Sequence, residues 1–488
     1  MSRWEYDLIV IGSGFGGAVC ALRAAEAGLR VAVLERGRRM TPRTYEDIAA
    51  GTAPLFHGPR AGGLLELHRL KGLLALTASG LGGGSIVYTA VTIRPPREVF
   101  DRGWPTGVTF EALARHYERV EAMIAPTPVP DALPRTTALE RIGSQMRAAV
   151  SRPPLSMDWP NDTARLHDSR ATDGVYPEVA MWLRGGGAAR KRTLGRTYLP
   201  RAESFGARLL PLHEVDVITP EAGGYRVDGR VFDGGEWRTV TLGAPRVVVA
   251  AGALGTVRLL LRCRDRRRSL PNLSAALGRR FYTNGDFGGL LVGPNLDLAP
   301  DAGPPVTAWI DLWARDRMFL METGLVPYDF GSFAGLLNPA RWFGGMRLSP
   351  AKEPTWSFGI MGYDDNPGRL MLGRRGALAH RHDPGGGAGY LARALTVLRQ
   401  VAAMTDGRLL LPPAALMRRW PITVHPLGGA AMADSPDHGV TDPFGEVFGH
   451  PGLYVADGSL LPVPTGAPPS MTIAAIAEHV AEHLIRSS

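Results

Sequence analysis

The sequence predicts an α/β protein built in two parts: an open parallel sheet assembled from separated stretches of the chain, and a second, sheet-based α+β domain. Three observations favour this fold class. Residues 8–35 run through strand, glycine turn, helix and strand, and residues 246–262 and 449–486 repeat the order of apolar strand, turn and helix. Residues 305–365 instead show strand-like alternation. Because similar strands occur at the start, middle and end of the chain, one discontinuous domain explains them better than several independent domains.

The first strand, at residues 8–11, runs directly into a glycine turn with the sequence GSGFGG at residues 12–17. Each glycine of this G-x-G-x-x-G pattern has a physical role: Gly12 permits the tight turn, Gly14 lets a pyrophosphate approach the backbone, and Gly17 lets the helix pack closely on the sheet. The N-terminus of the following helix offers unpaired N–H groups and the positive end of a dipole to phosphates. The turn therefore predicts a Rossmann-like dinucleotide site.

An acidic residue completes this motif. The helix ends at Gly28, and the second strand, at residues 31–34, is followed by Glu35, which lies 18 residues after Gly17. At this spacing a carboxylate can accept hydrogen bonds from the ribose hydroxyls of an adenosine. The full order of strand, glycine turn, helix, strand and acid is much more specific than the glycine pattern alone.

The remaining elements follow in order along the chain. We expect a second glycine cluster at 78–91, a helix near 110–124, strands within 207–219, a buried strand, turn and helix at 246–262, a strand and turn at 449–462, and a closing helix at 470–486. The closing helix carries one apolar face, formed by Ile473, Ile476, Val480 and Leu484. We expect Ser470 to be its N-cap, because a serine hydroxyl can accept hydrogen bonds from the first turn.

Composition and charge exclude several classes of protein. The net charge is +9, but the basic runs at 190–192 and 262–268 occur without any nucleic-acid-binding module, so we expect no nucleic-acid partner. The two cysteines, Cys20 and Cys263, predict neither a disulfide framework nor a metal site, and we expect Cys20 to be a core residue of the first helix. No apolar run approaches the roughly 20 residues of a membrane span. Because the first strand begins close to the N-terminus, we expect no signal peptide and a cytoplasmic location.

Five blocks of the chain, in order, resemble the glucose–methanol–choline (GMC) oxidoreductases, and within them the bacterial cholesterol-oxidase-like branch. These blocks are residues 12–37, 80–95, 247–260, 270–286 and a last one that runs from residue 425 to the C-terminus. The last block, which begins HPLGGAAMADSPDHGVTDPFGEVFGHPGLYVADGSLLP, is long and specific. Residues 100–200 and 290–420 match poorly, and these are the parts that shape the substrate pocket.

The resemblance implies FAD as the cofactor and a two-domain architecture. Residues 1–40, 205–288 and 425–488 would form a discontinuous FAD-binding domain. Residues 41–204 and 289–424 would form the substrate-binding domain with its connecting segments.

The resemblance also implies which residues contact the cofactor. They are Gly12, Gly14, Phe15, Gly17, Glu35, Gly82, Gly83, Gly84, Ser85, Val215, Ala251, Gly252, Asp457, Gly458, Pro469, Met471 and Thr472. The first glycine turn holds the ADP half, the second glycine cluster follows the pyrophosphate and flavin, and the N-terminus of the last helix points at the flavin pyrimidine edge, where reduced flavin carries negative charge. Some relatives bind flavin covalently through a histidine just after the second cluster. Residues 85–88 read SIVY here, so we expect non-covalent FAD.

Oxidation of an alcohol by a flavin moves a hydride from carbon to N5 and a proton from oxygen to a base, a task that suits histidine at neutral pH. His425, in the sequence HPLGG, matches the active-site histidine of the family. Glu322, in FLMETG, is a second catalytic candidate, because sterol-oxidising relatives use a carboxylate base; the alternative is a surface or salt-bridged glutamate. We expect Asp364 and Asp365 to belong to a turn.

One position departs from the family pattern. Relatives carry Asn or a second His where this chain has Pro468, and proline has neither a side-chain hydrogen-bonding group nor an N–H. The partner that would hold the substrate oxygen together with His425 is therefore missing. Either another residue replaces it, with Ser470, Tyr88 and Asn284 as candidates, or the reaction differs from simple alcohol oxidation.

The sequence leaves several functions open. The first is oxidation of a hydrophobic alcohol with His425 as base. The second, suggested by Pro468, is a desaturation, an oxidative decarboxylation or a cyclisation in specialised metabolism. A flavin-binding protein without turnover is disfavoured by the retention of His425, and a dehydrogenase that uses nicotinamide alone is disfavoured by the last block.

Aromatic residues gather in the region expected to form the substrate domain. They are Trp309, Trp313, Phe319, Phe330, Phe333, Trp342 and Phe343. We expect most of them in the core, and any that line the pocket would favour a bulky apolar substrate such as a sterol, terpenoid or polyketide. Oxygen or another acceptor would reoxidise the flavin. Peripheral contact with a membrane surface stays open, but no integral membrane contact is expected.

Overall fold

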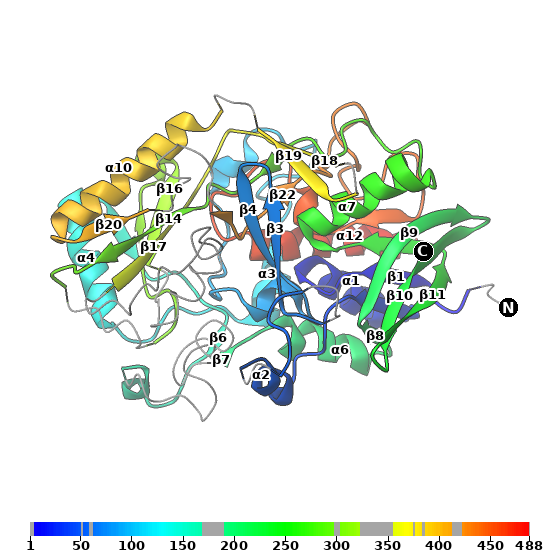
Figure 1. Cartoon of the computed structure of the whole chain (residues 1–488), viewed down its shortest axis with the longest axis horizontal. Coiled ribbons are helices and arrows are strands. Elements are labelled where there is room, and N and C mark those ends of the chain that lie inside the picture. Colours follow the sequence, from blue (N-terminus) through cyan, green and yellow to red (C-terminus); the bar gives the residue numbers. More distant parts are fainter. Residues whose placement is uncertain are drawn as a thin grey trace, which may run out of the picture.

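The computed structural model of this chain describes residues 4–49, 52–57, 62–167, 190–296, 303–322, 355–373, 376–382, 386–411 and 422–487. These residues form two groups of strands and helices that lie beside each other (Figure 1). The group at the right of the view contains the N-terminal strand, and the group at the left is built on a different sheet. Phe330, Phe333, Trp342 and Phe343 lie outside the described residues.

A five-stranded parallel sheet forms the centre of the first group, with the strand order β23-β12-β1-β2-β8. Its strands are β1 Leu8–Ile11, β2 Val31–Glu35, β8 Arg208–Pro211, β12 Arg246–Val249 and β23 Leu453–Val455. The central strands are almost wholly buried, as expected for a parallel sheet with both faces covered. They come from the start, middle and end of the chain, which confirms the predicted discontinuous sheet.

Helices and a meander complete this group. The helices are α1 Phe15–Glu26, α3 Ala114–Ile124, α6 Tyr198–Ser204, α7 Gly252–Leu261, which continues into the π-helical turn η5 Arg262–Arg267, and α12 Ser470–Arg486. Between β8 and β12 the chain forms an antiparallel meander of β9 His213–Glu221, β10 Gly224–Asp233 and β11 Glu236–Ala244. α1 packs against α6 and α12, and α12 packs against α3. Residues between 41 and 204 therefore contribute helices to the first group as well as to the second.

The second group is built on a six-stranded antiparallel sheet with the order β20-β14-β17-β16-β15-β5. Its strands are β5 Ala149–Ser151, β14 Phe287–Val292, β15 Trp309–Asp311, β16 Met318–Glu322, β17 Thr355–Gly362 and β20 Arg408–Leu410, and its helices are α4 Pro134–Met146 and α10 Ala388–Met404. The rings of Trp309 and Trp313 stack on Phe319 with centroid distances of 4.4 and 5.6 Å. These three aromatic residues are buried, as predicted.

A smaller layer joins the two groups. The hairpin of β3 Leu65–Leu70 and β4 Leu73–Ala78 lies in the middle of Figure 1, and β21 Ile422–Thr423 pairs in parallel with β4. β4 leads into the second glycine cluster and β21 leads into His425, so this pairing places two predicted site segments next to each other. The other short strands and helices are α2 Pro42–Ala49, α8 Trp313–Asp316, β6 Met157–Asp158, β7 Arg190–Lys191, β13 Phe281–Tyr282, β18 Arg369–Leu372, β19 Leu378–Arg381 and β22 Leu427–Gly428. The 3-10 turns are η1 Gly83–Ile86, η2 Arg97–Phe100, η3 Thr163–Leu166, η4 Leu194–Arg196 and η7 Gly458–Leu460.

Helices α1 and α12 run in the same direction and start at the same edge of the parallel sheet. A Cβ at Gly16 would lie 1.4 Å from a carbonyl oxygen in the turn after β23, and a Cβ at Gly458 in that turn would lie 3.2 Å from Ile473. Four residues later in both helices, the Cys20 sulfur lies 3.7 Å from the Ala477 carbonyl oxygen. The N-termini of both helices therefore lie where β1, β12 and β23 end.

The predicted N-cap of α12 is wrong. Pro469 takes that position with helical backbone angles (φ −84°, ψ −5°), and its carbonyl already accepts a hydrogen bond from the Ile473 N–H at 2.9 Å. Ser470 is therefore the first helical residue, and no side-chain hydrogen bond caps the N-terminus of α12.

A buried ion pair joins three helices of the first group. The carboxylate of Glu478, in α12, is fully buried and accepts hydrogen bonds from the Arg23 guanidinium of α1 at 2.8 Å and from the Tyr198 hydroxyl of α6 at 3.4 Å. Arg23 also contacts Glu26 at 2.6 Å. A buried charge is tolerated only with such partners, so the pair fixes how α12 lies against α1.

We expect Glu478→Ala to lower the free energy of unfolding by about 3 kcal/mol, because the Arg23 guanidinium loses its buried partner. Chemical denaturation of the purified protein measures this loss. The matched control is Asp233→Asn in the exposed Arg238–Asp233 pair (2.9 Å), which should cost less than about 1 kcal/mol. Equal losses in both variants would contradict the assignment.

Candidate active site

The two glycine segments predicted for the cofactor meet in the structure. Gly12 has a φ of 101°, and a Cβ there would lie 2.2 Å from the Ala250 carbonyl oxygen, so only glycine fits this turn. A Cβ at Gly17 would lie 1.9 Å from the Gly12 carbonyl oxygen, which confirms the close approach of helix and strand. A Cβ at Gly83 would lie 2.7 Å from the Cα of Gly14. Residues that are about 70 positions apart in the sequence thus share one edge of the sheet.

Glu35 and Ser13 connect these segments. The Ser13 hydroxyl donates to the Glu35 carboxylate at 2.7 Å and accepts from the Gly82 N–H at 3.1 Å. The other Glu35 oxygen accepts from the Gly37 N–H at 2.8 Å. Glu35 lies at the carboxyl end of β2, as predicted, and its buried carboxylate also holds the two glycine segments together.

The space around three glycines fits the pyrophosphate of FAD. At Gly14 and Gly84 no atom of the described residues, chain neighbours apart, lies within 4 Å of where a Cβ would be, so internal packing does not explain their lack of a side chain. Gly252 has the same open space, but its φ of 78° already favours glycine. Gly14 immediately precedes α1 and Gly252 begins α7, and the first N–H groups of a helix bind phosphate oxygens. These residues would hold the phosphates of the cofactor.

Asp457 uses its side chain within the protein. One carboxylate oxygen accepts from the Gly252 N–H at 2.8 Å and the Thr256 hydroxyl at 2.5 Å, and the other accepts from the Ser459 N–H at 2.8 Å. Burial raises the pKa of this carboxyl. Asp457 therefore positions the start of α7 and the turn at Gly458, and the cofactor contact predicted for these two residues would come from their backbone rather than from the carboxylate.

The other predicted cofactor residues surround the same edge of the sheet. Phe15 begins α1 and packs edge-on against Tyr88 at 5.7 Å between ring centroids. The Ser85 hydroxyl donates to the Gly82 carbonyl at 2.7 Å, and the Thr472 hydroxyl accepts from Tyr117 at 3.1 Å. The rest lie as follows: Val215 in β9, Ala251 before α7, Pro469 before α12 and Met471 in its first turn. Their contacts with FAD remain predictions.

His425 forms a pair with a carboxylate that sequence reasoning missed. Its Nδ1 lies 2.9 Å from Oδ1 of Asp286, a buried residue. The Asp286 carboxylate also accepts from the Thr423 hydroxyl at 2.8 Å, the Val424 N–H at 2.8 Å and the His425 N–H at 3.1 Å. A carboxylate at Nδ1 favours the tautomer with its proton on that atom. No described residue hydrogen-bonds Nε2, so its lone pair is free to accept a proton.

Asp286 belongs to a turn at residues 283–286 that holds several parts of the site. The Asn284 side chain accepts from the Gly466 N–H at 2.9 Å and donates to the Ala467 carbonyl at 2.8 Å. Asp364 accepts from the Thr283 hydroxyl at 3.0 Å and the Gly285 N–H at 2.8 Å. Burial raises the pKa of Asp364 to about 6. Residues 363–367 form an irregular segment rather than the predicted turn, and Asp364 supports the turn at 283–286.

The structure separates the three candidates for the partner lost at Pro468. Both the oxygen and the NH2 group of the Asn284 side chain are hydrogen-bonded to the loop that precedes Pro468. The Tyr88 hydroxyl donates to the Arg192 carbonyl at 3.1 Å, and burial raises the pKa of this phenol to about 12. The Ser470 hydroxyl is buried and has no hydrogen-bond partner among the described residues.

The structure does not bring Glu322 together with His425. One oxygen of the fully buried Glu322 carboxylate accepts from the N–H and hydroxyl of Thr307, both at 2.5 Å, and the other lies 3.4 Å from Nε of Arg135 in α4. Burial raises the pKa of Glu322, although Arg135 opposes this shift. Glu322 ends β16, and it is the other end of this strand, at Met318, that approaches the turn at 283–286. The two ends of β16 are four residues apart, which is about 13 Å at 3.3 Å per residue. The contacts of Glu322 with Thr307 and Arg135 match the alternative of a salt-bridged glutamate.

Two signals in the sequence could have revealed Asp286. It ends the block at 270–286 that resembles the family, and it directly precedes a strand. Its partner His425 lies 139 positions away, so only the fold shows that the two side chains meet.

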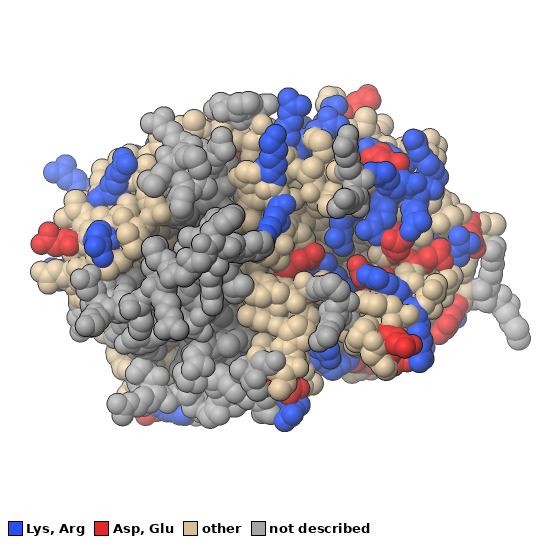
Figure 2. All heavy atoms as spheres, viewed as in Figure 1, with Lys and Arg blue, Asp and Glu red and all other residues tan. Residues whose placement is uncertain are grey.

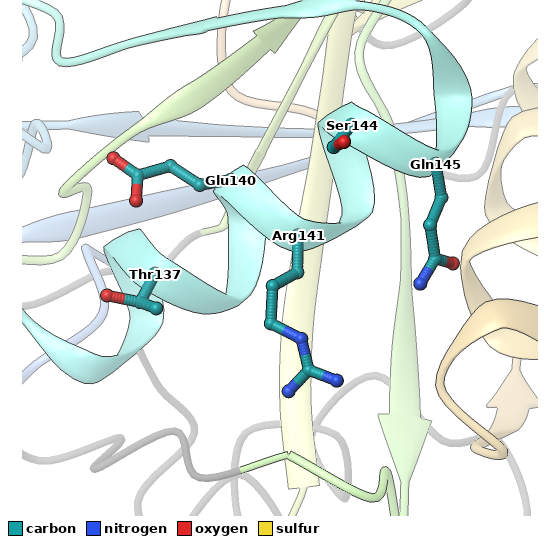
Figure 3. A pocket seen from close by; sticks show the side chains of 5 residues that line it. All are labelled: Thr137, Glu140, Arg141, Ser144 and Gln145. Carbon is teal, nitrogen blue, oxygen red and sulfur yellow. The ribbon is translucent and has the colours of Figure 1, made fainter.

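Other surface features lie apart from this site. A hollow of about 390 Å³ lies along α4 and is lined by Thr137, Glu140, Arg141, Ser144 and Gln145 (Figure 3), all exposed. Figure 2 shows basic side chains gathered over the region of α7, with acidic ones among them. In that region Arg262 and Arg267 both pair with Asp216. No helix within the described residues combines the length and apolar composition needed to cross a lipid bilayer.

Comparison with known proteins places the chain in a family. The sequence model described as GMC oxidoreductase matches residues 406–477, and the one described as FAD binding domain matches residues 7–63. The structure is similar to that of pyridoxine 4-oxidase from Mesorbium loti, with a TM-score of 0.68, 17% sequence identity and 98% of each chain covered. At this identity the likeness shows the fold.

Two curated relatives extend over nearly the whole chain. A cholesterol oxidase of Mycobacterium tuberculosis is 30% identical, with 98% of this chain and 90% of the relative covered. A cholesterol oxidase of Acinetobacter baumannii is 26% identical, with 99% and 95% covered. With these matches and a parallel sheet whose glycine turns fit a dinucleotide, the chain belongs to the GMC oxidoreductase family and is an FAD-dependent oxidoreductase acting on CH–OH donors, with FAD bound non-covalently.

Proposed function

We propose that this enzyme oxidises a hydrophobic alcohol and that His425 is the base that takes the hydroxyl proton. The observation that carries the proposal is the hydrogen bond between Nδ1 of His425 and Asp286. FAD, when bound, supplies the acceptor for the hydride that leaves the alcohol carbon. The protein must then orient the alcohol and remove its proton.

The Asp286–His425 pair suits that task. Because the carboxylate keeps the proton of the neutral imidazole on Nδ1, the Nε2 lone pair faces outward and can accept the proton of an alcohol. The imidazolium that forms is stabilised by the same carboxylate, as in other catalytic histidine–carboxylate pairs. The His425 side chain is 25% exposed, which leaves Nε2 reachable by a substrate.

Apolar surface beside the base supports a hydrophobic substrate. Val424 is 47% exposed directly next to His425, although its backbone N–H is held by Asp286. The ring of Trp313 lies against Gly466, where a Cβ would be 2.5 Å from the ring. Together with the two relatives named cholesterol oxidases, these contacts favour a sterol-, terpenoid- or polyketide-like alcohol, with oxygen or another acceptor reoxidising the flavin.

A panel of alcohols tests the proposal. Sterols, terpenoid alcohols and short polar alcohols are added anaerobically to the purified enzyme, and the visible absorbance of oxidised flavin is followed. Bleaching by the bulky alcohols alone supports the proposed substrate class. If no alcohol bleaches the flavin, Pro468 becomes the observation that favours the second candidate function: desaturation, oxidative decarboxylation or cyclisation.

We expect His425→Ala to retain FAD but to slow flavin reduction by about 10²–10⁴-fold, because the alcohol proton has no base to accept it. Anaerobic stopped-flow absorbance measures the rate. His438→Ala is the control, because His438 is exposed and bonds to Ser435 at 3.0 Å. A rate like that of the unmodified enzyme in His425→Ala would exclude the proposed role.

We expect Asp286→Asn to act through His425 as the loss of a positioning group. Flavin reduction should slow by about 10-fold or more, because the amide stabilises neither the tautomer nor the charged imidazole. Anaerobic stopped-flow absorbance measures the rate, and Asp286→Glu, which keeps a carboxylate, should recover part of it. An equal loss of rate in Asp286→Asn and Asp286→Glu would indicate that Asp286 is only structural.

A further inference from the structure

The turn at residues 283–286 orients two parts of the site and bends the chain into a costly conformation. Asp286 bonds His425, and the Asn284 side chain bonds the loop that precedes α12. Asn284 has a φ of 56°, in the left-handed region that residues other than glycine adopt infrequently. Such a bend persists only where the surrounding structure holds it. The groups that hold the turn therefore influence where the proposed base lies.

Asp364 is a buried carboxyl that holds both sides of this bend. Its Oδ2 accepts hydrogen bonds from the Thr283 hydroxyl at 3.0 Å and from the Gly285 N–H at 2.8 Å, so it bonds the residues before and after Asn284. Its Oδ1 accepts from the Asn366 N–H at 3.4 Å. Burial raises the pKa of Asp364 to about 6, so at neutral pH the carboxyl is mostly ionised and acts as an acceptor.

Thr283 links Asp364 to the segment that carries His425. Its hydroxyl donates to Asp364, while its carbonyl oxygen lies 3.0 Å from the hydroxyl oxygen of Thr423. The Thr423 hydroxyl is also 2.8 Å from the Asp286 carboxylate and accepts from the His425 N–H at 3.0 Å. A continuous set of contacts therefore runs from Asp364 to the backbone of the proposed base.

We propose that Asp364 is a positioning residue for the proton transfer: its carboxylate keeps the turn at residues 283–286 in the conformation in which Asp286 bonds Nδ1 of His425. Without this carboxylate, two buried donors of the turn would be left unsatisfied, and the turn would rearrange to reach other acceptors. Asp364 acts through the turn and is not itself a catalytic residue. The consequence for catalysis rests on the proposed role of His425 as base, whereas the consequence for the His425 ring does not.

Other contacts keep the turn in place as a whole. The Tyr390 hydroxyl of α10 donates to the Gly285 carbonyl at 2.7 Å, and the Gly362 N–H donates to the Asn284 carbonyl at 3.3 Å. The bonds from the Asn284 side chain to the loop before α12 are also independent of Asp364. Removing one hydrogen bond to Asp364 should therefore change the shape of the turn without unfolding the protein.

The test is nitrogen NMR of the FAD-loaded enzyme with isotope-labelled histidine rings, recorded without substrate at about pH 8, where histidine is ordinarily neutral. The chemical shifts of the two ring nitrogens show which of them carries the proton. The His425 signals are those that disappear in His425→Ala. In the unmodified enzyme, Asp286 should keep the proton on Nδ1 of His425.

Paired variants separate the hydrogen bond from packing. Thr283→Val removes the hydroxyl that donates to Asp364 and keeps a side chain of similar size, so the His425 proton should distribute over both ring nitrogens. Asp364→Leu should have the same effect. Thr283→Ser and Asp364→Asn each keep an oxygen for these bonds and should retain the proton on Nδ1. Thr405→Val is the matched control, because this buried hydroxyl bonds to the Val401 carbonyl at the end of α10.

A second readout connects the ring to the reaction. Thr283→Val should slow flavin reduction at saturating alcohol by about 10-fold or more, because a misplaced base loses the geometry of proton transfer. The alcohol concentration that gives half the maximal rate should change little, since substrate binding is not the step affected. Anaerobic stopped-flow absorbance measures both quantities.

Each outcome decides the proposal. An altered His425 ring in Thr283→Val and Asp364→Leu, with an unaltered ring in Thr283→Ser and Asp364→Asn, supports it. The same ring signals in all variants overturn it, as does an equal change in Thr283→Val and Thr283→Ser, which would show that packing is the cause. An altered ring with an unchanged rate of flavin reduction supports the positioning role and contradicts His425 as the base. If Asp364→Leu does not fold, the Thr283 variants decide.

Discussion

The turn at residues 283–286 is the constraint on which the rest of the site depends. Asn284 and Gly285 both have left-handed backbone angles (φ 56° and 67°), and a Cβ at Gly285 would lie 2.4 Å from the Gly362 carbonyl oxygen. Within this turn, Asn284 bonds the loop before α12 and Asp286 bonds the segment that carries His425. The proposed base and the start of α12 are therefore both held by this one turn.

Helix N-termini give the cofactor side of the site its electrostatic character. α1, α7 and α12 all begin at the edge where the parallel strands end. The Asp457 carboxylate bonds both the start of α7 and the turn that follows β23. Each helix presents N–H donors and a positive dipole end there. A ligand that carries phosphates at one end and gains negative charge at the other finds donors along its length.

Burial alone does not mark the functional groups of this protein. Glu478, Glu322 and Asp457 are buried carboxyls, yet each is bonded to partners within the chain and has a structural explanation. The informative group is His425, because Asp286 bonds its Nδ1 and no described residue bonds its Nε2. A ring nitrogen that is oriented by a carboxylate and left without a partner among the described residues is what a general base requires.

The sequence by itself determined the parallel sheet, the two glycine segments and FAD, and it offered His425 as the candidate base, because these depend on local patterns: strand and helix periods, glycine turns and short motifs. Only the tertiary structure showed that Asp286 orients His425, that Glu322 pairs with Arg135 and Thr307, and that Pro469 rather than Ser470 caps α12. Contacts between side chains 139 positions apart, or on different sheets, leave no periodic signal in the chain. They are set by how the separated segments pack, and that packing decides which polar groups are satisfied within the protein and which remain free for ligands.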